Sequence, residues 1–196
     1  MFGLLDPDAA HRAGERLAEL VAVNGYRIAT GFAGTPFVTD ALTLTGHVDD
    51  AYSLLLEQSC PSWLYTVTMG ATTIWERWDS MLPDGSINAG EMTSFNHYAL
   101  GAVADWMHRT IGGITPLDPG YARVLVAPRP GGGLEWASTS LESRHGRIEV
   151  DWRRDGADLV LSVSLPDGIT GVLDLPDQAP IELGSGRRHY RTGGDH

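Results

Sequence analysis

The sequence predicts a two-part α+β protein in which a helical first part is followed by a strand-rich second part. Apolar residues recur at helical spacing up to about residue 113 and alternate as in strands after it. The formal charge changes at the same place, from -8 over residues 1–113 to -3 over residues 114–196, within a total of -11. Because 196 residues suit one large domain or two small ones, we expect two domains, residues 1–113 and residues 114–196.

Five helices are expected in the first part. Asp6-Pro7 is a good helix start, since an aspartate caps free amides and proline is tolerated at the first helical position. The helix that follows is amphipathic and is expected to end near Asn24-Gly25. The other helices are expected over residues 35–44, 48–57, 62–69 and 94–111, the last with Ser94 as its N-cap and Gly112-Gly113 as its end. Short connections that contain glycine suggest antiparallel neighbours.

The second part is expected to form a small antiparallel β-sandwich. Clusters of Pro, Gly and Asp separate short runs that are rich in β-branched residues. The expected strands cover residues 122–127, 134–143, 146–153, 159–165 and 171–175. Five or more short strands at this spacing are typical of a sandwich. Trp136 and Trp152 fall in strand patterns that predict burial of both indoles.

Composition excludes several classes of function. The net charge of -11 argues against nucleic-acid binding, which depends on Lys and Arg. All 14 basic residues are arginine, so neither a Schiff-base lysine nor a phosphate-loop lysine is present. The His and Cys residues show no metal-ligand spacing, and the single Cys60 is expected to be a small buried residue. We therefore expect no metal and no cofactor.

The sequence also bears on membranes and location. No run approaches the 18 or more apolar residues of a membrane span, so no membrane association is expected. The N-terminus begins apolar at Phe2 and lacks the positively charged start of a secretory signal. This slightly favours a cytoplasmic protein, although localisation stays open because a signal could precede Met1.

The segment from Gly70 to Asp79 is the first candidate for chemistry. Two tryptophans, Trp75 and Trp78, flank the pair Glu76-Arg77. A carboxylate between indoles suits sugar chemistry, because aromatic faces stack on a pyranose while the carboxylate acts on a water or a glycosidic oxygen. Apolar walls would raise the Glu76 pKa and Arg77 would lower it. The alternative is a surface Glu-Arg pair beside two core tryptophans.

Two further segments are weaker candidates. In Ser94-Phe95-Asn96-His97, a capping Ser94 would place His97 in the first turn of a helix, ready to bond a polar ligand. A structural histidine explains the pattern equally well. Residues 31–35, with two glycines, could bring backbone close to a ligand, but a tight turn is the more common use of such a pattern.

Taken together, these motifs resemble a known family. GATTIWERWD at 70–79, SFNHYALGAV at 94–103 and GYRIATGFAGTPFVTDAL at 25–42 are similar to the C-terminal part of bacterial α-L-rhamnosidases of glycoside hydrolase family 78. PGYARVLVAPRP at 119–130 and the strands after it resemble that family's C-terminal β-sandwich. The resemblance covers essentially the whole chain.

The resemblance implies a fold and an activity. The family's catalytic domain is an (α/α)6 barrel, of which residues 1–113 would form the C-terminal half, and its enzymes hydrolyse terminal α-L-rhamnosyl bonds with inversion. The resemblance assigns the general base to Glu76 and a rhamnose contact to His97. Trp75 and Trp78 are expected as walls of the sugar pocket. The expected partner is therefore an α-L-rhamnoside, bound without a metal or cofactor.

The resemblance also implies that something is missing. The family's general acid lies in an earlier part of the barrel, upstream of any residue in this chain. Asp79 and Glu91 are the nearest alternative acids, and we expect both to be structural. The chain is therefore expected to be a fragment with little activity by itself, and the open face of its half-barrel is expected to promote self-association.

Two other classes of function stay open. The sandwich could be a carbohydrate-binding module supported by the helices, which exposed coplanar aromatic residues would favour. The chain could also be a structural fragment, or part of another (α/α)6 enzyme such as a different glycosidase or a polysaccharide lyase. A lyase would need basic residues for its uronate substrate, and the acidic helical part argues against one.

Overall fold

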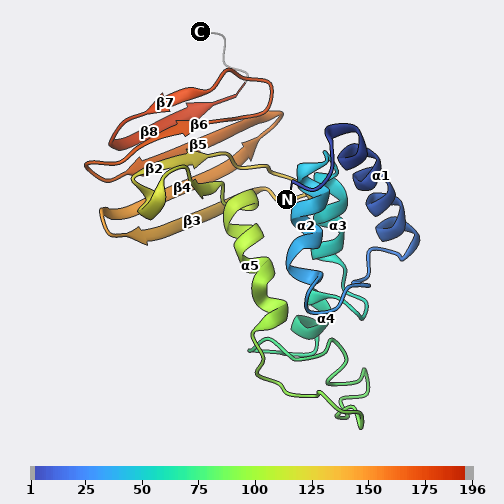
Figure 1. Cartoon of the computed structure of the whole chain (residues 1–196). Coiled ribbons are helices and arrows are strands. Elements are labelled where there is room, and N and C mark those ends of the chain that lie inside the picture. The colour runs from blue at the N-terminus through green and yellow to red at the C-terminus, as the bar shows by residue number, and fades with distance from the viewer. Residues whose placement is uncertain (1–2, 193–196) are drawn as a thin grey trace. The chain divides into compact units, whose positions relative to one another are not determined.

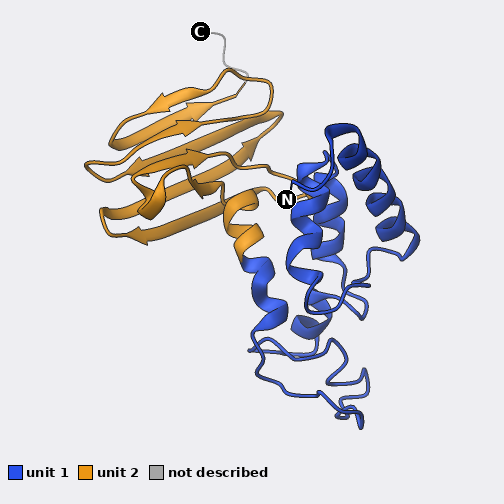
Figure 2. Ribbon diagram, viewed as in Figure 1, with its two compact units in different colours: residues 1–104 blue, residues 105–196 orange. Residues whose placement is uncertain are grey.

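A computed structural model describes residues 3–192 of the chain. Phe2 and the last four residues of the predicted second domain lie outside the described residues. The chain divides into two compact units, residues 1–104 and residues 105–196, which we call the helical unit and the sandwich unit (Figure 2). Each unit is described by itself.

The first four helices of the helical unit confirm the predicted pattern (Figure 1). They are α1 (Pro7–Val23), α2 (Thr35–Leu44), α3 (Val48–Leu56) and α4 (Trp63–Thr68). Asp6 caps α1 as expected, because its Oδ1 accepts the Ala9 amide at 2.8 Å. Ser62 caps α4 in the same way, with its Oγ accepting the Tyr65 amide at 3.0 Å.

Close packing between the helices depends on buried apolar side chains and on one glycine. Leu42 of α2 and Tyr52 of α3 are completely buried. A Cβ added at Gly14 of α1 would lie 2.3 Å from the Cβ of Thr45, the C-cap residue of α2. Glycine at this position therefore lets α1 approach the end of α2.

The fifth predicted helix is shorter than expected. Regular structure begins at Ala99 with a 3-10 turn (Ala99–Ala102), continues as α5 (Val103–Trp106) and ends in a π-helical turn (Met107–Ile111). The prediction that Ser94 caps this helix is wrong. The Ser94 carbonyl accepts the Glu76 amide at 2.9 Å, and the His97 amide donates to the Ile74 carbonyl at 2.8 Å. These pairings with a distant segment take the backbone groups that a helical turn would need.

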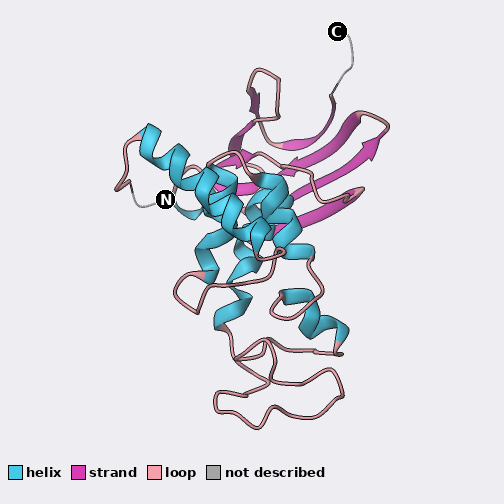
Figure 3. Cartoon of the chain, turned by 90° about the vertical axis from the view of Figure 1, so that its right-hand side faces the viewer, coloured by secondary structure: helices cyan, strands magenta, loops and turns pink. Residues whose placement is uncertain are grey.

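In the part that the structure describes, the sandwich unit contains two four-stranded sheets (Figures 1 and 3). One sheet has the order β1-β2-β6-β7 and is made of β1 (Ile114–Pro116), β2 (Arg123–Val126), β6 (Thr170–Leu173) and β7 (Ile181–Leu183). The other has the order β3-β4-β5-β8 and is made of β3 (Trp136–Ser143), β4 (Gly146–Asp155), β5 (Asp158–Leu165) and β8 (Gly186–Arg191). All five predicted strands are present, and β1, β7 and β8 are additional.

One pairing differs from the antiparallel pattern that the sequence predicts. Strands β2 and β6 run parallel, whereas the other strand pairs within residues 3–192 are antiparallel. The chain between β2 and β6 forms three strands of the second sheet before it returns, and so long a crossover permits a parallel partner.

Alternation along the strands builds the core of the sandwich unit. In β4, Ile148, Val150 and Trp152 are buried in turn, and the Trp152 Nε1 donates to the Ile111 carbonyl at 2.7 Å. The predicted burial of Trp152 is confirmed, but that of Trp136 is wrong, since its side chain is 68% exposed. Trp136 begins β3 on the outward side of the alternation, which turns its indole away from the core.

Candidate active site

The predicted site residues of the helical unit lie on a long irregular segment between α4 and the last helix. Residues 69–98, which we call the 69–98 loop, contain no helix and only an isolated bridge between Met81 and Ile87 (Figure 3). The Tyr65 hydroxyl of α4 anchors the loop by donating to the Met81 carbonyl at 2.7 Å. Loops of this length without secondary structure are uncommon in compact domains and are often functional.

Glu76 is held at a defined position by the second half of the loop. Its amide donates to the Ser94 carbonyl at 2.9 Å, and the Ser94 amide donates to the Glu76 Oε2 at 3.2 Å. Two residues that face each other in an antiparallel sheet exchange two backbone hydrogen bonds, and here the Glu76 carboxylate replaces the Glu76 carbonyl as one of the two acceptors. The Thr73 hydroxyl adds a bond to the Phe95 carbonyl. These bonds orient a half-buried carboxylate without neutralising it by a cation.

Arg77 pairs with a different carboxylate from the one that the sequence suggests. Its Nε and Nη2 donate to Asp79 at 2.6 and 3.2 Å, and its Nη1 donates to the Glu91 carbonyl at 3.1 Å. Asp79 also accepts the Asn88 side-chain amide at 2.9 Å. Arg77 and Asp79 therefore tie three parts of the 69–98 loop together. This agrees with the structural role expected for Asp79.

His97 lies within a group of aromatic rings. Its imidazole stacks on Phe32, with ring centroids 5.1 Å apart, and on Tyr98 at 5.6 Å. The Ala99 amide donates to the His97 Nδ1 at 3.3 Å. A neutral ring that accepts at Nδ1 carries its proton on Nε2. His97 therefore presents a hydrogen-bond donor from a half-buried ring that two aromatic rings contact.

The two tryptophans of the motif differ in exposure. Trp75 is 3% exposed and packs edge-to-face on Phe95 at 5.1 Å. An indole so buried offers almost no face to a sugar, so its position does not match the pocket wall that the sequence suggested. Trp78 is half-buried and packs edge-to-face on Trp63 at 5.7 Å.

A pocket of about 380 Å³ brings Glu76, Arg77 and Trp78 together with residues from elsewhere in the helical unit. Its lining residues are Thr30, Gly31, Phe32, Glu76, Arg77, Trp78, Glu91, Met92 and Leu100. His97 reaches this group through its contact with Phe32. The volume falls in the range of small-molecule sites, and a carboxylate between aromatic and aliphatic walls suits a neutral polyol.

The pocket contains residues that the motifs alone did not assign. Gly31 and Phe32 lie in the two-glycine segment that the sequence suggested as a tight turn, and the turn is present, since the Gly34 amide donates to the Gly31 carbonyl at 3.0 Å. Met92 of the 69–98 loop also lines the pocket and has a φ of 61°, an unusual value for a residue with a side chain. No sequence signal marks Met92 as a pocket residue.

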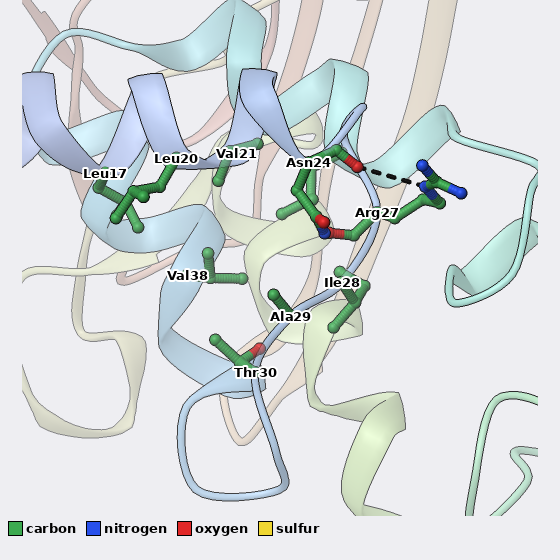
Figure 4. A pocket seen from close by; sticks show the side chains of 10 residues that line it. Leu17, Leu20, Val21, Asn24, Arg27, Ile28, Ala29, Thr30 and Val38 are labelled. Carbon is green, nitrogen blue, oxygen red and sulfur yellow. Dashed lines mark hydrogen bonds between the residues drawn. The ribbon is translucent and has the colours of Figure 1, made fainter.

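A second pocket, between α1, α2 and the connecting segment, differs in character (Figure 4). It has a volume of about 180 Å³ and is lined by aliphatic side chains such as Leu17, Leu20 and Val38. Two of its polar residues bond each other, with the Arg27 Nε donating to the Asn24 carbonyl at 3.2 Å. Apart from Arg27, no lining residue of this pocket carries an ionisable side chain.

Cys60 is half-buried rather than fully buried, and desolvation by burial raises the pKa of its thiol, with a smaller contribution from Asp79. A raised pKa opposes formation of a thiolate nucleophile.

Over residues 3–192, no three His, Cys, Asp or Glu side chains gather closely enough to hold a metal ion. Over the same residues, no helix is long and apolar enough to cross a membrane.

Comparison with known proteins identifies the family. Residues 1–111 match the bacterial alpha-L-rhamnosidase 6 hairpin glycosidase domain, and residues 113–189 match the bacterial alpha-L-rhamnosidase C-terminal domain. The chain belongs to the bacterial α-L-rhamnosidase family. The resemblance carried by the GATTIWERWD and SFNHYALGAV motifs is thus confirmed.

Sequence identity to individual α-L-rhamnosidases supports the same family assignment. The chain is 43% identical over 177 residues to an α-L-rhamnosidase of Streptomyces avermitilis, covering 90% of this chain, and 35% identical over 192 residues to one of Formosa agariphila, covering 98%. These matches span 17% and 21% of those two glycoside hydrolases. The chain therefore corresponds to about a fifth of the length of these relatives.

Solved structures of the family support the fold. Native α-L-rhamnosidase from Aspergillus terreus matches 96% of this chain with a TM-score of 0.93 and 42% identity. The Streptomyces avermitilis α-L-rhamnosidase complexed with L-rhamnose matches 96% with a TM-score of 0.91 and 38% identity. The matched regions are 22% and 20% of those chains.

Proposed function

We propose that this chain supplies the general base and part of the sugar pocket of an inverting α-L-rhamnosidase. The observation that carries the proposal is the Glu76 carboxylate, which the Ser94 amide orients at the edge of an aromatic-lined pocket. The names of the relatives support the substrate class, since they are α-L-rhamnosidases and one was crystallised with L-rhamnose.

Glu76 would act on a water molecule. Its Oε2 is occupied by the Ser94 amide, so Oε1 is the oxygen that would take the water's proton. The water oxygen then bonds to the anomeric carbon as the bond to the leaving oxygen breaks on the opposite face. In inverting enzymes a second carboxyl group, roughly 6.5–9.5 Å away, donates a proton to that leaving oxygen.

The neighbouring side chains would bind and orient the sugar. His97, protonated on Nε2, would donate a hydrogen bond to a rhamnose hydroxyl. Trp78 would form an apolar wall, since it is half-buried and lines the pocket. For Trp75, which the motif assigned to sugar binding, burial against Phe95 favours a positioning role beneath Glu76.

The domain assignment follows from the same proposal. Residues 1–113 would form the later half of the six-hairpin barrel, and residues 114–196 would form the C-terminal β-sandwich. The two family models meet between residues 111 and 113, close to this boundary. The compact units divide a little earlier, between Ala104 and Asp105.

The 196 residues by themselves are expected to show little turnover. The family resemblance assigns no general acid to any residue of this chain, and Asp79 is occupied by Arg77 and Asn88. General acid catalysis contributes on the order of 100- to 10,000-fold. Robust release of nitrophenol from p-nitrophenyl α-L-rhamnoside by the isolated chain would contradict this expectation.

A chimera tests the catalytic proposal directly. The matched segment of the Streptomyces avermitilis relative is replaced by this chain, and hydrolysis of p-nitrophenyl α-L-rhamnoside is measured. We expect activity, with inversion visible by NMR as initial formation of the β-anomer. Glu76→Gln should then lower kcat by about 100- to 10,000-fold.

The matched control neutralises another carboxylate of the same loop. Asp84 accepts hydrogen bonds from the Ser86 hydroxyl and amide in a local turn, so Asp84→Asn should leave the rate nearly unchanged. A folded Glu76→Gln chimera with the activity of the parent chimera would exclude Glu76 as the base. Retention of the α-anomer in the first product would exclude inversion.

Self-association is a further part of the proposal. Leu4, Leu5 and Leu44 are 84%, 56% and 66% exposed around a cavity of about 460 Å³ in the helical unit. Exposed apolar surface of this kind promotes association between copies. Sedimentation velocity should show dimers or larger species of the isolated chain, and a single monomer at all concentrations would contradict this part.

A further inference from the structure

The outward face of the sheet β3-β4-β5-β8 carries two adjacent rows of side chains that cross all four strands. The register places Trp136, Arg153, Val160 and Arg191 in one row and Ser138, Asp151, Ser162 and His189 in the next. The buried residues that alternate with them, such as Trp152 and Leu161, point to the core. The two rows are therefore a surface, not a part of the fold's interior.

Trp136 is the unusual member of this surface. Its indole is 68% exposed, although burying a tryptophan is strongly favourable and the other strand tryptophan, Trp152, is 2% exposed. An indole at the start of an outward row is not needed for the core of the sandwich. Exposed aromatic residues beside polar groups are typical of binding surfaces.

A hollow lies next to this indole. It has a volume of about 430 Å³, and Trp136, Ser138, Asp151, Arg153, Val160, Ser162 and His189 contribute to its lining. The hollow exists because serines occupy the centre of the second row, where the register puts them on either side of Asp151. Small side chains between large ones leave a depression of the size that a small ligand requires.

The polar groups of the hollow define the chemistry of its ligand. The Ser138 hydroxyl donates to the Asp151 Oδ1, and this hydrogen bond fixes the position of the carboxylate at the centre of the row. Hydroxyls, a carboxylate, a guanidinium and an imidazole supply both donors and acceptors. Asp151 and Arg153 offset each other in formal charge. Such a surface selects neither an anion nor a cation.

The charged groups around the hollow are engaged with one another. Arg191 bonds Asp155 and Asp158 at 2.7 Å each, and Arg187 is paired with Glu149. These ion pairs at the flanks leave the hollow with neutral hydrogen-bonding character. A ligand with many hydroxyls and an apolar face fits an indole beside a row of donors and acceptors.

We propose that this surface is a second, non-catalytic saccharide-binding site, in which Trp136 stacks on a pyranose ring and Asp151 bonds its hydroxyls. The site belongs to the sandwich unit and needs no residue of the candidate active site. It would hold a neutral saccharide of one or a few rings. A second site of this kind would retain a branched or polymeric substrate on the protein.

The test is an NMR titration of the whole 15N-labelled chain with L-rhamnose, methyl α-L-rhamnoside and maltotriose. We expect saturable shifts of the Trp136 indole N–H and of backbone amides in β3, β4 and β5 with at least one of these sugars. Trp136→Ala should weaken the affinity by at least about tenfold, in line with loss of a central aromatic anchor. Asp151→Asn should weaken it less, since the amide keeps an acceptor.

Two control variants distinguish binding in this hollow from binding elsewhere on the chain. Ser140→Ala changes the same face of β3 outside the hollow and should keep the affinity of the parent chain. Glu76→Gln should also keep the affinity that is read from the Trp136 indole, so that failure of the catalytic proposal and failure of this one are distinct results. No shift of Trp136 with any of the three sugars would overturn the proposal. Amide shifts in β3, β4 and β5 that saturate with the parent affinity in Trp136→Ala would overturn it as well, as would shifts that depend on protein concentration alone.

Discussion

The two units hold their polar side chains in different ways. In the sandwich unit, strand ladders set the positions of the outward residues of the strands, as for Ser138 opposite Asp151. In the helical unit, Glu76 lies in a loop of irregular backbone and is positioned by single hydrogen bonds to Ser94. Backbone groups that are not used by a ladder are free to orient a side chain, which is why the candidate catalytic group lies in the irregular region.

The difference extends to how charge is treated. The sandwich unit pairs its charges across strands, as Arg187 does with Glu149 and Arg191 with Asp155. The helical unit carries most of the net negative charge, and its Arg77 ties the 69–98 loop by way of Asp79. Ion pairs thus add to the backbone pairing of β-strands in the sandwich unit, whereas in the 69–98 loop of the helical unit an ion pair connects segments that no strand pairing joins.

The largest expected effect concerns the core of the sandwich unit. Trp152→Ala removes a buried indole and its bond to the Ile111 carbonyl, and should lower the free energy of unfolding by about 3 to 5 kcal/mol. Thermal and chemical denaturation measure the loss. Trp136→Ala is the matched control and should cost little, because that indole is 68% exposed. Equal losses of unfolding free energy in the two variants would contradict the assignment of Trp152 to the core and of Trp136 to the surface.

The next effect concerns the 69–98 loop. Arg77→Ala should lower the stability of the loop by about 1 to 2 kcal/mol, less than for a fully buried ion pair because both side chains are 36% exposed. Amide hydrogen exchange should accelerate in residues 69–98 and stay unchanged in α1 to α3. Arg16→Ala, which breaks an exposed pair with Glu19, is the control and should change neither. Global unfolding in place of local loosening would show that the loop is part of the helical core.

A smaller effect is expected at the start of α1. Asp6→Ala removes the side-chain acceptor of the Ala9 amide and should cost about 1 kcal/mol of helix stability. Hydrogen exchange should be faster in the first turn of α1, whereas Asp6→Asn should restore most of the protection. Unchanged exchange in Asp6→Ala would show that packing alone maintains the helix start.

The smallest effect is a pH dependence in the sandwich unit. A hydrogen bond from Arg191 holds the pKa of Asp155 below its ordinary value of 3.8. A carboxyl group with a lowered pKa in the folded state stabilises the fold above its unfolded pKa, and this contribution disappears as the pH falls through the folded pKa. The melting temperature should therefore drop below about pH 4, and Asp155→Asn should reduce that drop. High salt should also reduce it, since the pair is exposed.

Much of the fold was predictable from short-range patterns. The bounds of α1 to α4 follow from residues such as Asp6, Pro7 and Ser62, whose preferences act within one helical turn. Strands β3, β4 and β5 follow from alternation and from the turn residues between them. The family follows from the Trp-Glu-Arg-Trp and Ser-Phe-Asn-His motifs, and so does the assignment of Glu76 and His97 as candidates.

The tertiary structure alone decided how distant segments meet. The bond from the Glu76 amide to the Ser94 carbonyl joins residues 18 positions apart, and together with the bond from the His97 amide to the Ile74 carbonyl it prevents the helix start that Ser94 predicts locally. The same holds for Arg77, whose neighbour in sequence is Glu76 but whose partner is Asp79, and for Trp136, whose outward position depends on where β3 begins. Local propensity and periodicity act over a few residues, whereas these outcomes depend on which backbone groups a distant segment has already bonded.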